Sequence, residues 1–110
     1  AAEMAKAGAD AIIAHVGTTV GGSIGVKSAV VSWDHTMKVT RDIIAAATQV
    51  RKDIFFLCHG GPINTPDDAA RVMGATDCVG FVGASSLERM GVEESLTGLT
   101  RKFKSLKIKK

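Results

Sequence analysis

The chain has 110 residues, of which 45% are hydrophobic and 23% charged, a balance typical of one small globular domain. No apolar run approaches the ~20 residues that a membrane-spanning helix needs, so we expect no membrane partner. The net charge is +3, but six of the 14 basic residues lie in the last ten positions. This surplus is a short basic tail, and with only 5% aromatic residues it does not predict a nucleic-acid partner.

The first ten residues, AAEMAKAGAD, have the composition of a helix interior and lack the pattern of a signal peptide. We therefore expect the chain to be part of a longer protein. Cys58 and Cys78 each lie in or beside an apolar run, without the spacing of a metal or redox motif. Such cysteines are typical of reduced thiols in a cytoplasmic protein. The sequence predicts no particular cofactor.

The first predicted elements are a strand and a helix that a long loop separates. Residues 11–16 form a continuous apolar run, which is typical of a strand buried on both faces. The helix is predicted over residues 35–52, with His35 at its surface-exposed start. Its apolar stripe consists of Val39, Ile43, Ala46 and Val50.

The connecting loop, residues 17–34, is unusually long for a link between a strand and a helix, and such length favours a ligand-binding loop. Gly17 and Gly22 have the spacing of a P-loop, but the lysine and serine or threonine that must follow are absent. We expect instead a flexible loop that closes over the ends of the strands, with Ser23 or Lys27 as ligand contacts.

Two further strands are predicted over residues 54–59 and 78–83. Between them, residues 65–68 combine an N-cap, a proline and two acids, which predicts a helix over 66–74. A closing helix follows the third strand. Its apolar stripe is Val92, Leu96, Leu99, Phe103 and Leu106.

Strands that alternate with helices predict an α/β fold with a parallel sheet and right-handed crossovers. A sheet of three parallel strands has two unpaired edges and an incomplete core. We therefore expect the rest of a longer chain, or a second copy of this one, to complete the fold, and a homo-oligomer is favoured.

The second and third strands both end in glycine, at the edge where parallel sheets bind ligands. Glycine lets a backbone N–H group approach an anion closely, and the segment after Gly83 begins a helical turn whose free N–H groups favour negative charge. The alternative is that the glycines only turn the chain and a serine only caps the helix. We favour a phosphate or substrate site formed by Gly60, Gly61, Gly83, Ala84, Ser85, Ser86 and Ser23.

His15 and His59 lie at the ends of the first two predicted strands. If these strands are neighbours, ~4.8 Å apart, both imidazoles reach the same edge and can serve proton transfer, an oxyanion contact or a metal. Two ordinary structural histidines are the alternative. Cys58 is adjacent to His59 and must point to the opposite face, so the two cannot act as a nucleophile and its base. No carboxylate lies at these strand ends, so a magnesium site is not predicted from this segment alone, and no metal ligands are assigned.

Three motifs, GGSIG, LCHGGPI and GFVGASSLER, occur in that order and together carry a resemblance over about residues 7–106. The chain resembles the C-terminal part of the TIM-barrel signal transduction protein family, also called phosphoenolpyruvate hydrolase-like or indole-glycerol-phosphate-synthase-like. The resemblance implies strands six to eight of a (β/α)8 barrel, with the first five strands outside this sequence. In plants and fungi, similar domains follow an ATP-binding-like domain. The resemblance also places Gly60, Gly61, Gly83, Ala84 and Ser85 where phosphate-binding barrels hold phosphate.

Residues and resemblance together predict a TIM-barrel domain that binds a small phosphorylated or carboxylated metabolite. An enzyme is favoured, namely a lyase or hydrolase acting on a phosphoenolpyruvate-like compound, with His15 and His59 as its catalytic residues. The alternative is a non-catalytic module for ligand sensing, signalling or assembly.

Overall fold

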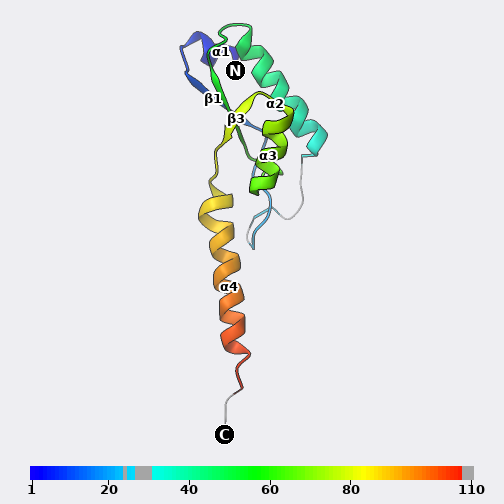
Figure 1. Cartoon of the computed structure of the whole chain (residues 1–110), viewed down its shortest axis with the longest axis vertical. Helices are drawn as coiled ribbons and strands as arrows, with labels where there is room; N and C mark the ends of the chain where they lie inside the picture. Colours follow the sequence, from blue (N-terminus) through cyan, green and yellow to red (C-terminus); the bar gives the residue numbers. More distant parts are fainter. Residues whose placement is uncertain (24, 27–30, 108–110) are drawn as a thin grey trace.

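The computed structural model describes residues 1–23, 25–26 and 31–107. The chain alternates helices and strands along its length (Figure 1). The elements are α1 (Ala2–Lys6), β1 (Ala11–His15), α2 (Trp33–Thr48), β2 (Phe55–His59), α3 (Pro66–Ala75), β3 (Cys78–Phe81), the π-helical turn η1 (Ser86–Met90) and α4 (Gly91–Lys104).

The three strands form one parallel sheet in the order β1-β2-β3, so the predicted α/β fold with a parallel sheet is confirmed. Ala11 lies opposite Phe55, and this register brings His15 opposite His59. The register with β3 shifts by one residue next to Leu57. Because all strands run in the same direction, the loops that follow them emerge at one edge of the sheet, the carboxyl edge.

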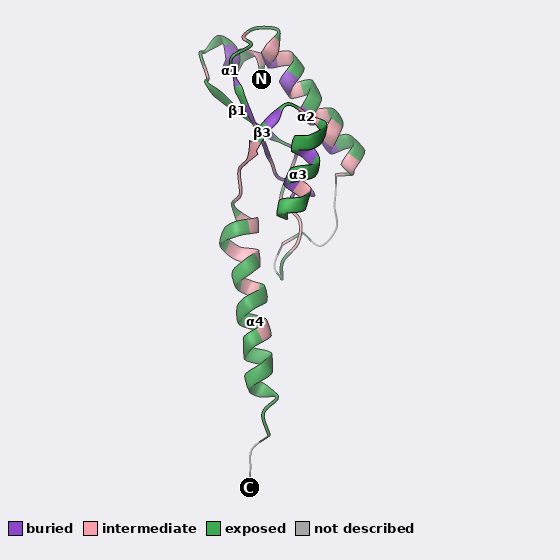
Figure 2. Cartoon of the chain, viewed as in Figure 1, coloured by how far each residue is buried: buried purple, intermediate pink, exposed green. Residues whose placement is uncertain are grey.

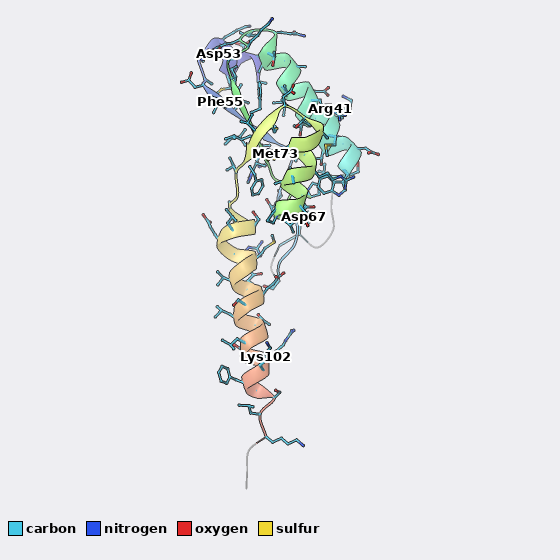
Figure 3. All side chains as sticks on the ribbon, viewed as in Figure 1. Arg41, Asp53, Phe55, Asp67, Met73 and Lys102 are labelled. Atoms are coloured by element: carbon cyan, nitrogen blue, oxygen red, sulfur yellow. The ribbon has the colours of Figure 1, made fainter. Side chains whose placement is uncertain are left out.

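Helices α2 and α3 cover one face of the sheet, and the core lies between them and the strands (Figure 2). Alternate strand residues point into this core, whereas the strands were predicted to be buried on both faces. On the other face, Ile13 and Phe55 are 47% and 63% exposed, and Val79 on β3 is 61% exposed. Figure 3 shows Phe55 on the side of the sheet away from α2 and α3. Within the described chain, this second face, the open face, has no cover.

Helix α2 begins two residues before its predicted start because Ser32 caps it. The Ser32 hydroxyl accepts a hydrogen bond from the His35 backbone N–H at 3.2 Å. The predicted apolar stripe is also displaced by one position, because Val50 is exposed and the other members are half-buried. The buried line is Thr36, Thr40, Ile44 and Ala47.

Thr40 fits this buried line because its hydroxyl finds a partner within the helix, whereas the Thr36 hydroxyl is buried without a hydrogen-bond partner among the described residues. Thr40 Oγ1 donates to the Thr36 carbonyl oxygen at 2.8 Å. A reading by hydrophobicity alone therefore passes over the two threonines.

Helix α3 starts at the predicted residue. The Thr65 hydroxyl accepts from the Asp68 N–H at 3.2 Å, and the Asp68 carboxylate accepts from the Thr65 N–H at 2.9 Å, which is a complete capping box. The Arg71 guanidinium, in the middle of α3, stacks 4.3 Å above the Trp33 ring and ties α3 to the start of α2.

The closing helix does not pack on the sheet. It runs away from the strands, and the molecule reaches 73 Å along its longest axis (Figure 1). The radius of gyration is 18.4 Å, against ~13 Å for a compact domain of this length. None of the helices in the described ranges has the length and apolarity to cross a bilayer.

Candidate functional site at the carboxyl edge of the sheet

His15 and His59 meet at the carboxyl edge, as the strand ends predicted. Their rings are 4.9 Å apart between centroids and tilted by 54°. They are register partners on neighbouring strands and belong to the open face, where His15 is exposed and His59 half-buried. Two imidazoles thus stand side by side at the point where ligands bind parallel sheets.

The hydrogen bonds of the two rings are opposite in kind. His59 Nδ1 lies 2.6 Å from the Val82 carbonyl oxygen, which can only accept, so Nδ1 carries the hydrogen. His15 Nδ1 accepts from the Gly17 N–H at 3.3 Å, so in the neutral ring the hydrogen is on Nε2. The pair therefore offers a basic lone pair on His59 Nε2 and a donor on His15 Nε2, which is the combination that acid–base chemistry requires.

Cys58 is fully buried on the opposite face from His59, as predicted for adjacent residues of a strand. Its hydrogen bond with Cys78 and its burial raise the pKa of the Cys58 thiol above the ordinary range. A thiol in that state is a poor nucleophile at neutral pH, and its contribution is to the core.

The Gly60-Gly61 turn joins the loops that follow β1 and β2. Gly60 has φ +82° and lies so close to the Gly17 carbonyl oxygen that a Cβ would overlap it. The Gly61 N–H donates to the same oxygen at 2.9 Å, and the Gly61 carbonyl accepts from the Val20 N–H at 3.2 Å. Here the Gly61 amide already has a partner within the chain, so an anion would have to displace Gly17 to bind it.

The segment after β3 places Gly83 against Leu87, because a Cβ on Gly83 would lie 2.6 Å from Leu87 Cδ1. Ser85 is the N-cap of the π-helical turn and makes no side-chain capping bond. The Ser85 and Ser86 N–H groups have no backbone acceptor in the ranges that the structure describes. These two amides and hydroxyls, with Ala84 exposed beside them, are the groups of this segment that can receive an anion.

Arg89 and Glu93 tie the long loop to the start of α4, and sequence reasoning missed both. Arg89 Nη1 lies 3.0 Å from Glu93 Oε1, and Arg89 Nη2 donates to the Gly21 carbonyl at 3.3 Å. The Glu93 carboxylate accepts from the Ser23 N–H at 2.8 Å. These bonds bring Ser23, a predicted ligand contact, beside the first turn of α4. Lys27, the other predicted contact, lies outside the described residues.

Asn64, in the loop that follows β2, is a third residue that the sequence did not single out. Its Oδ1 is buried and has no hydrogen-bond partner among the described residues. The position of a Cβ on Gly21 would be 3.9 Å from Asn64 Nδ2 and 3.3 Å from Met90 Sδ. The loops after all three strands therefore converge at the carboxyl edge, with an unused acceptor among them.

Two hollows adjoin these loops. One of about 200 Å³ is lined by Gly17, Thr18, Val20, Val26, Val31 and Gly61. Another of about 460 Å³ lies beside Ser23 and Glu93. A third, of about 330 Å³, lies next to Arg41 and Thr76 at the amino end of β3, away from the histidines. Within the described ranges, no three His, Cys, Asp or Glu side chains gather as metal ligands do.

The chain is therefore an α/β protein with a parallel sheet. Its paired histidines and its glycine turns share the carboxyl edge of that sheet. The sequence profile of the Phosphoenolpyruvate hydrolase-like family matches residues 1–106, and the chain belongs to that family. The family expected from the three motifs is thereby confirmed.

Relatives of the chain are much longer proteins. Two tomato (Solanum lycopersicum) proteins, ToMV susceptible protein tm-1(GCR26) and ToMV resistance protein Tm-1(GCR237), are each 45% identical over 109 residues, or 98% of this chain and 14% of theirs. The Sinorhizobium fredii protein y4pA, named as a candidate transcriptional regulatory protein, is 29% identical over 106 residues, or 96% of this chain and 17% of its own. The chain spans less than a fifth of the length of these relatives.

Proposed function

We propose that β1, β2 and β3 are three neighbouring strands of a (β/α)8 barrel completed by the rest of a longer protein. The supporting observations are the parallel order of the strands and the helices on one face only. The other face is apolar and open, as the interior side of a barrel segment is when its other strands are absent. In such barrels the loops at the carboxyl ends of the strands form the active site.

This edge binds a small phosphorylated or carboxylated metabolite of the phosphoenolpyruvate type. Ser85 and Ser86 supply amide donors at a helix start, Ser23 lies next to α4, and the acceptor on Asn64 suits a hydroxyl or a water. The family's description, which names a phosphoenolpyruvate hydrolase, supports a ligand of this kind.

The observation that carries the catalytic proposal is the opposite hydrogen-bonding state of the two neighbouring imidazoles. His59 takes a proton from water or from the substrate through Nε2, and the Val82 carbonyl stabilises the imidazolium that results. His15 donates through Nε2 to the oxygen on which negative charge develops. The pair thus supplies base and acid for a hydrolase or lyase without a third side chain.

The test is an assay of phosphate and pyruvate release from phosphoenolpyruvate by the full-length protein. Replacing His59 with Asn should lower kcat by ~10²–10⁴-fold, the range for the loss of a general base. His35→Asn is the matched control, because His35 is exposed in the first turn of α2 and lies on neither β1 nor β2. Equal turnover by His59→Asn, His15→Asn and the control would refute the catalytic assignment.

The second candidate is a non-catalytic module for ligand sensing. The names of the relatives favour it, since they refer to virus susceptibility or resistance and to transcriptional regulation and name no reaction. Calorimetry with phosphoenolpyruvate and with inorganic phosphate separates the two candidates. Binding without turnover supports the sensor, whereas the absence of both would reject the site itself.

A further inference from the structure

Helix α4 carries an apolar surface that is left largely exposed in the described chain. Its members recur at steps of four, three and four residues and are each more than half exposed, at 51%, 61%, 54% and 65% in chain order. Such spacing places them on one face of a helix, in the arrangement by which two helices pack together. The apolar stripe of α4 consists of Val92, Leu96, Leu99 and Phe103.

The charges of α4 are divided between its two ends. Glu93 and Glu94 lie in the first turn, whereas the last turn is basic and contains Arg101, Lys102 and Lys104. In a parallel pair of such helices, like charges would lie side by side at both ends. An antiparallel pair instead brings the acidic end of each helix beside the basic end of the other.

The same orientation matches the apolar side chains by size. When two copies of α4 run antiparallel about an axis between positions 97 and 98, Val92 lies opposite Phe103 and Leu96 opposite Leu99. Each opposed pair then combines a residue from the first half of one stripe with a residue from the second half of the other, and the larger Phe103 meets the smaller Val92. In the parallel arrangement Phe103 would face its own copy.

We propose that α4 pairs antiparallel with α4 of a second copy of this chain, and that this helix pair holds a homodimer together. The helix is placed to do so because it projects from the sheet and leaves its stripe clear of the strands and of α2 and α3 (Figure 1). Lys102, in the basic end of the helix, stands on this projecting part (Figure 3).

The size of the contact is near the lower limit for a specific interface. With Leu106, which follows the helix and is 70% exposed, the stripe presents roughly 500 Å² per copy, or ~1,000 Å² for the pair, which is the lower limit for a specific interface. The dimer should therefore be in equilibrium with monomer and should depend on protein concentration.

Sedimentation of the full-length protein over a range of concentrations tests the proposal. Leu99→Glu buries a charge in the centre of the pair and should weaken association at least tenfold. Thr97→Glu adds the same charge to the same helix off the stripe and should change association less than twofold. A wild-type protein that stays monomeric up to ~100 µM, or a dimer that Leu99→Glu leaves intact, would overturn the proposal.

Cysteine cross-linking decides the orientation and does not depend on the folding of Leu99→Glu. A mixture of Val92→Cys and Phe103→Cys proteins should form disulfide-linked dimers under mild oxidation, and Val92→Cys alone should not. The native Cys58 and Cys78 are buried and should not interfere. Cross-linking of Val92→Cys with itself at a comparable rate, or no cross-linking of the mixture, would contradict an antiparallel pair.

Discussion

Among single residues, Glu93 connects the long loop to α4 through a carboxylate that is only 21% exposed. The Ser23 N–H and, after it, the Arg89 guanidinium hold the pKa of Glu93 below its ordinary value. A carboxyl group whose pKa is depressed by folding stabilises the contact above the unfolded pKa and loses that contribution as pH falls through the folded pKa. The loop contact should therefore be intact at neutral pH and be lost only in acid.

The direction of the pKa shift of Glu93 can be measured at the Ser23 amide. Its nitrogen and proton shifts should titrate with a midpoint below ~4.3, the usual pKa of a glutamate. Glu93→Gln should abolish that titration, and Glu94→Gln, one residue along the same helix, should leave it in place. A midpoint at or above the usual value would show that Ser23 and Arg89 do not hold the carboxylate in solution.

Residues whose roles depend on distant partners were the ones that sequence reasoning missed. Arg89 and Glu93 have the spacing of an ordinary helix-surface ion pair, and only the fold shows that they bind a loop about seventy positions earlier. The two histidines were predictable, because a position at a strand end specifies the edge on which the side chain lies. Their hydrogen-bonding states were not predictable, since both depend on backbone groups of the loops.

Among the elements, those with local signals were predicted closely. The capping box of α3 lies within four consecutive residues, so the sequence predicted the start of this helix correctly. The buried side of α2 was displaced by one position, because it contains the polar residues Thr36 and Thr40, and the bond from the Thr40 hydroxyl to the Thr36 carbonyl exists only once the helix has formed. The glycine turn after β2 was recognised. The hydrogen bond from the Gly61 N–H to the Gly17 carbonyl was not, because it joins two loops and has no local signal in the sequence.

Gly→Ala changes in that turn and in α3 should have opposite effects on stability. Gly60→Ala places a side chain at φ +82° and against the Gly17 carbonyl, so it should lower the free energy of unfolding by ~2–4 kcal/mol. Gly74→Ala lies in α3 with nothing within 4 Å of the new Cβ, and it should raise that free energy by up to ~1 kcal/mol. Urea unfolding of the full-length protein measures both changes. A loss of less than ~1 kcal/mol for Gly60→Ala would mean that the turn relaxes.

For the whole molecule, the open face of the sheet is the feature to explain. Alternation along β1 and β2 buries one set of side chains under α2 and α3 and leaves the other set, including Ile13 and Phe55, exposed to water. A soluble protein rarely leaves such a set of large apolar side chains uncovered. The barrel proposal covers it, because further strands would turn this face into the packed interior.

Thiol labelling tests that consequence directly. Ile13→Cys should react rapidly with a water-soluble maleimide in the 110-residue chain, where Ile13 is 47% exposed. In the full-length protein it should react at least tenfold more slowly, because a packed barrel interior would exclude the reagent. Lys38→Cys, exposed on α2 away from the sheet, is the matched control and should react at a similar rate in both proteins. Cys58 and Cys78 are buried in the chain and give the unreactive baseline. If Ile13→Cys reacts as fast in the full-length protein as in the chain alone, this face is not a barrel interior, and the carboxyl edge must then bind its ligand on an open sheet.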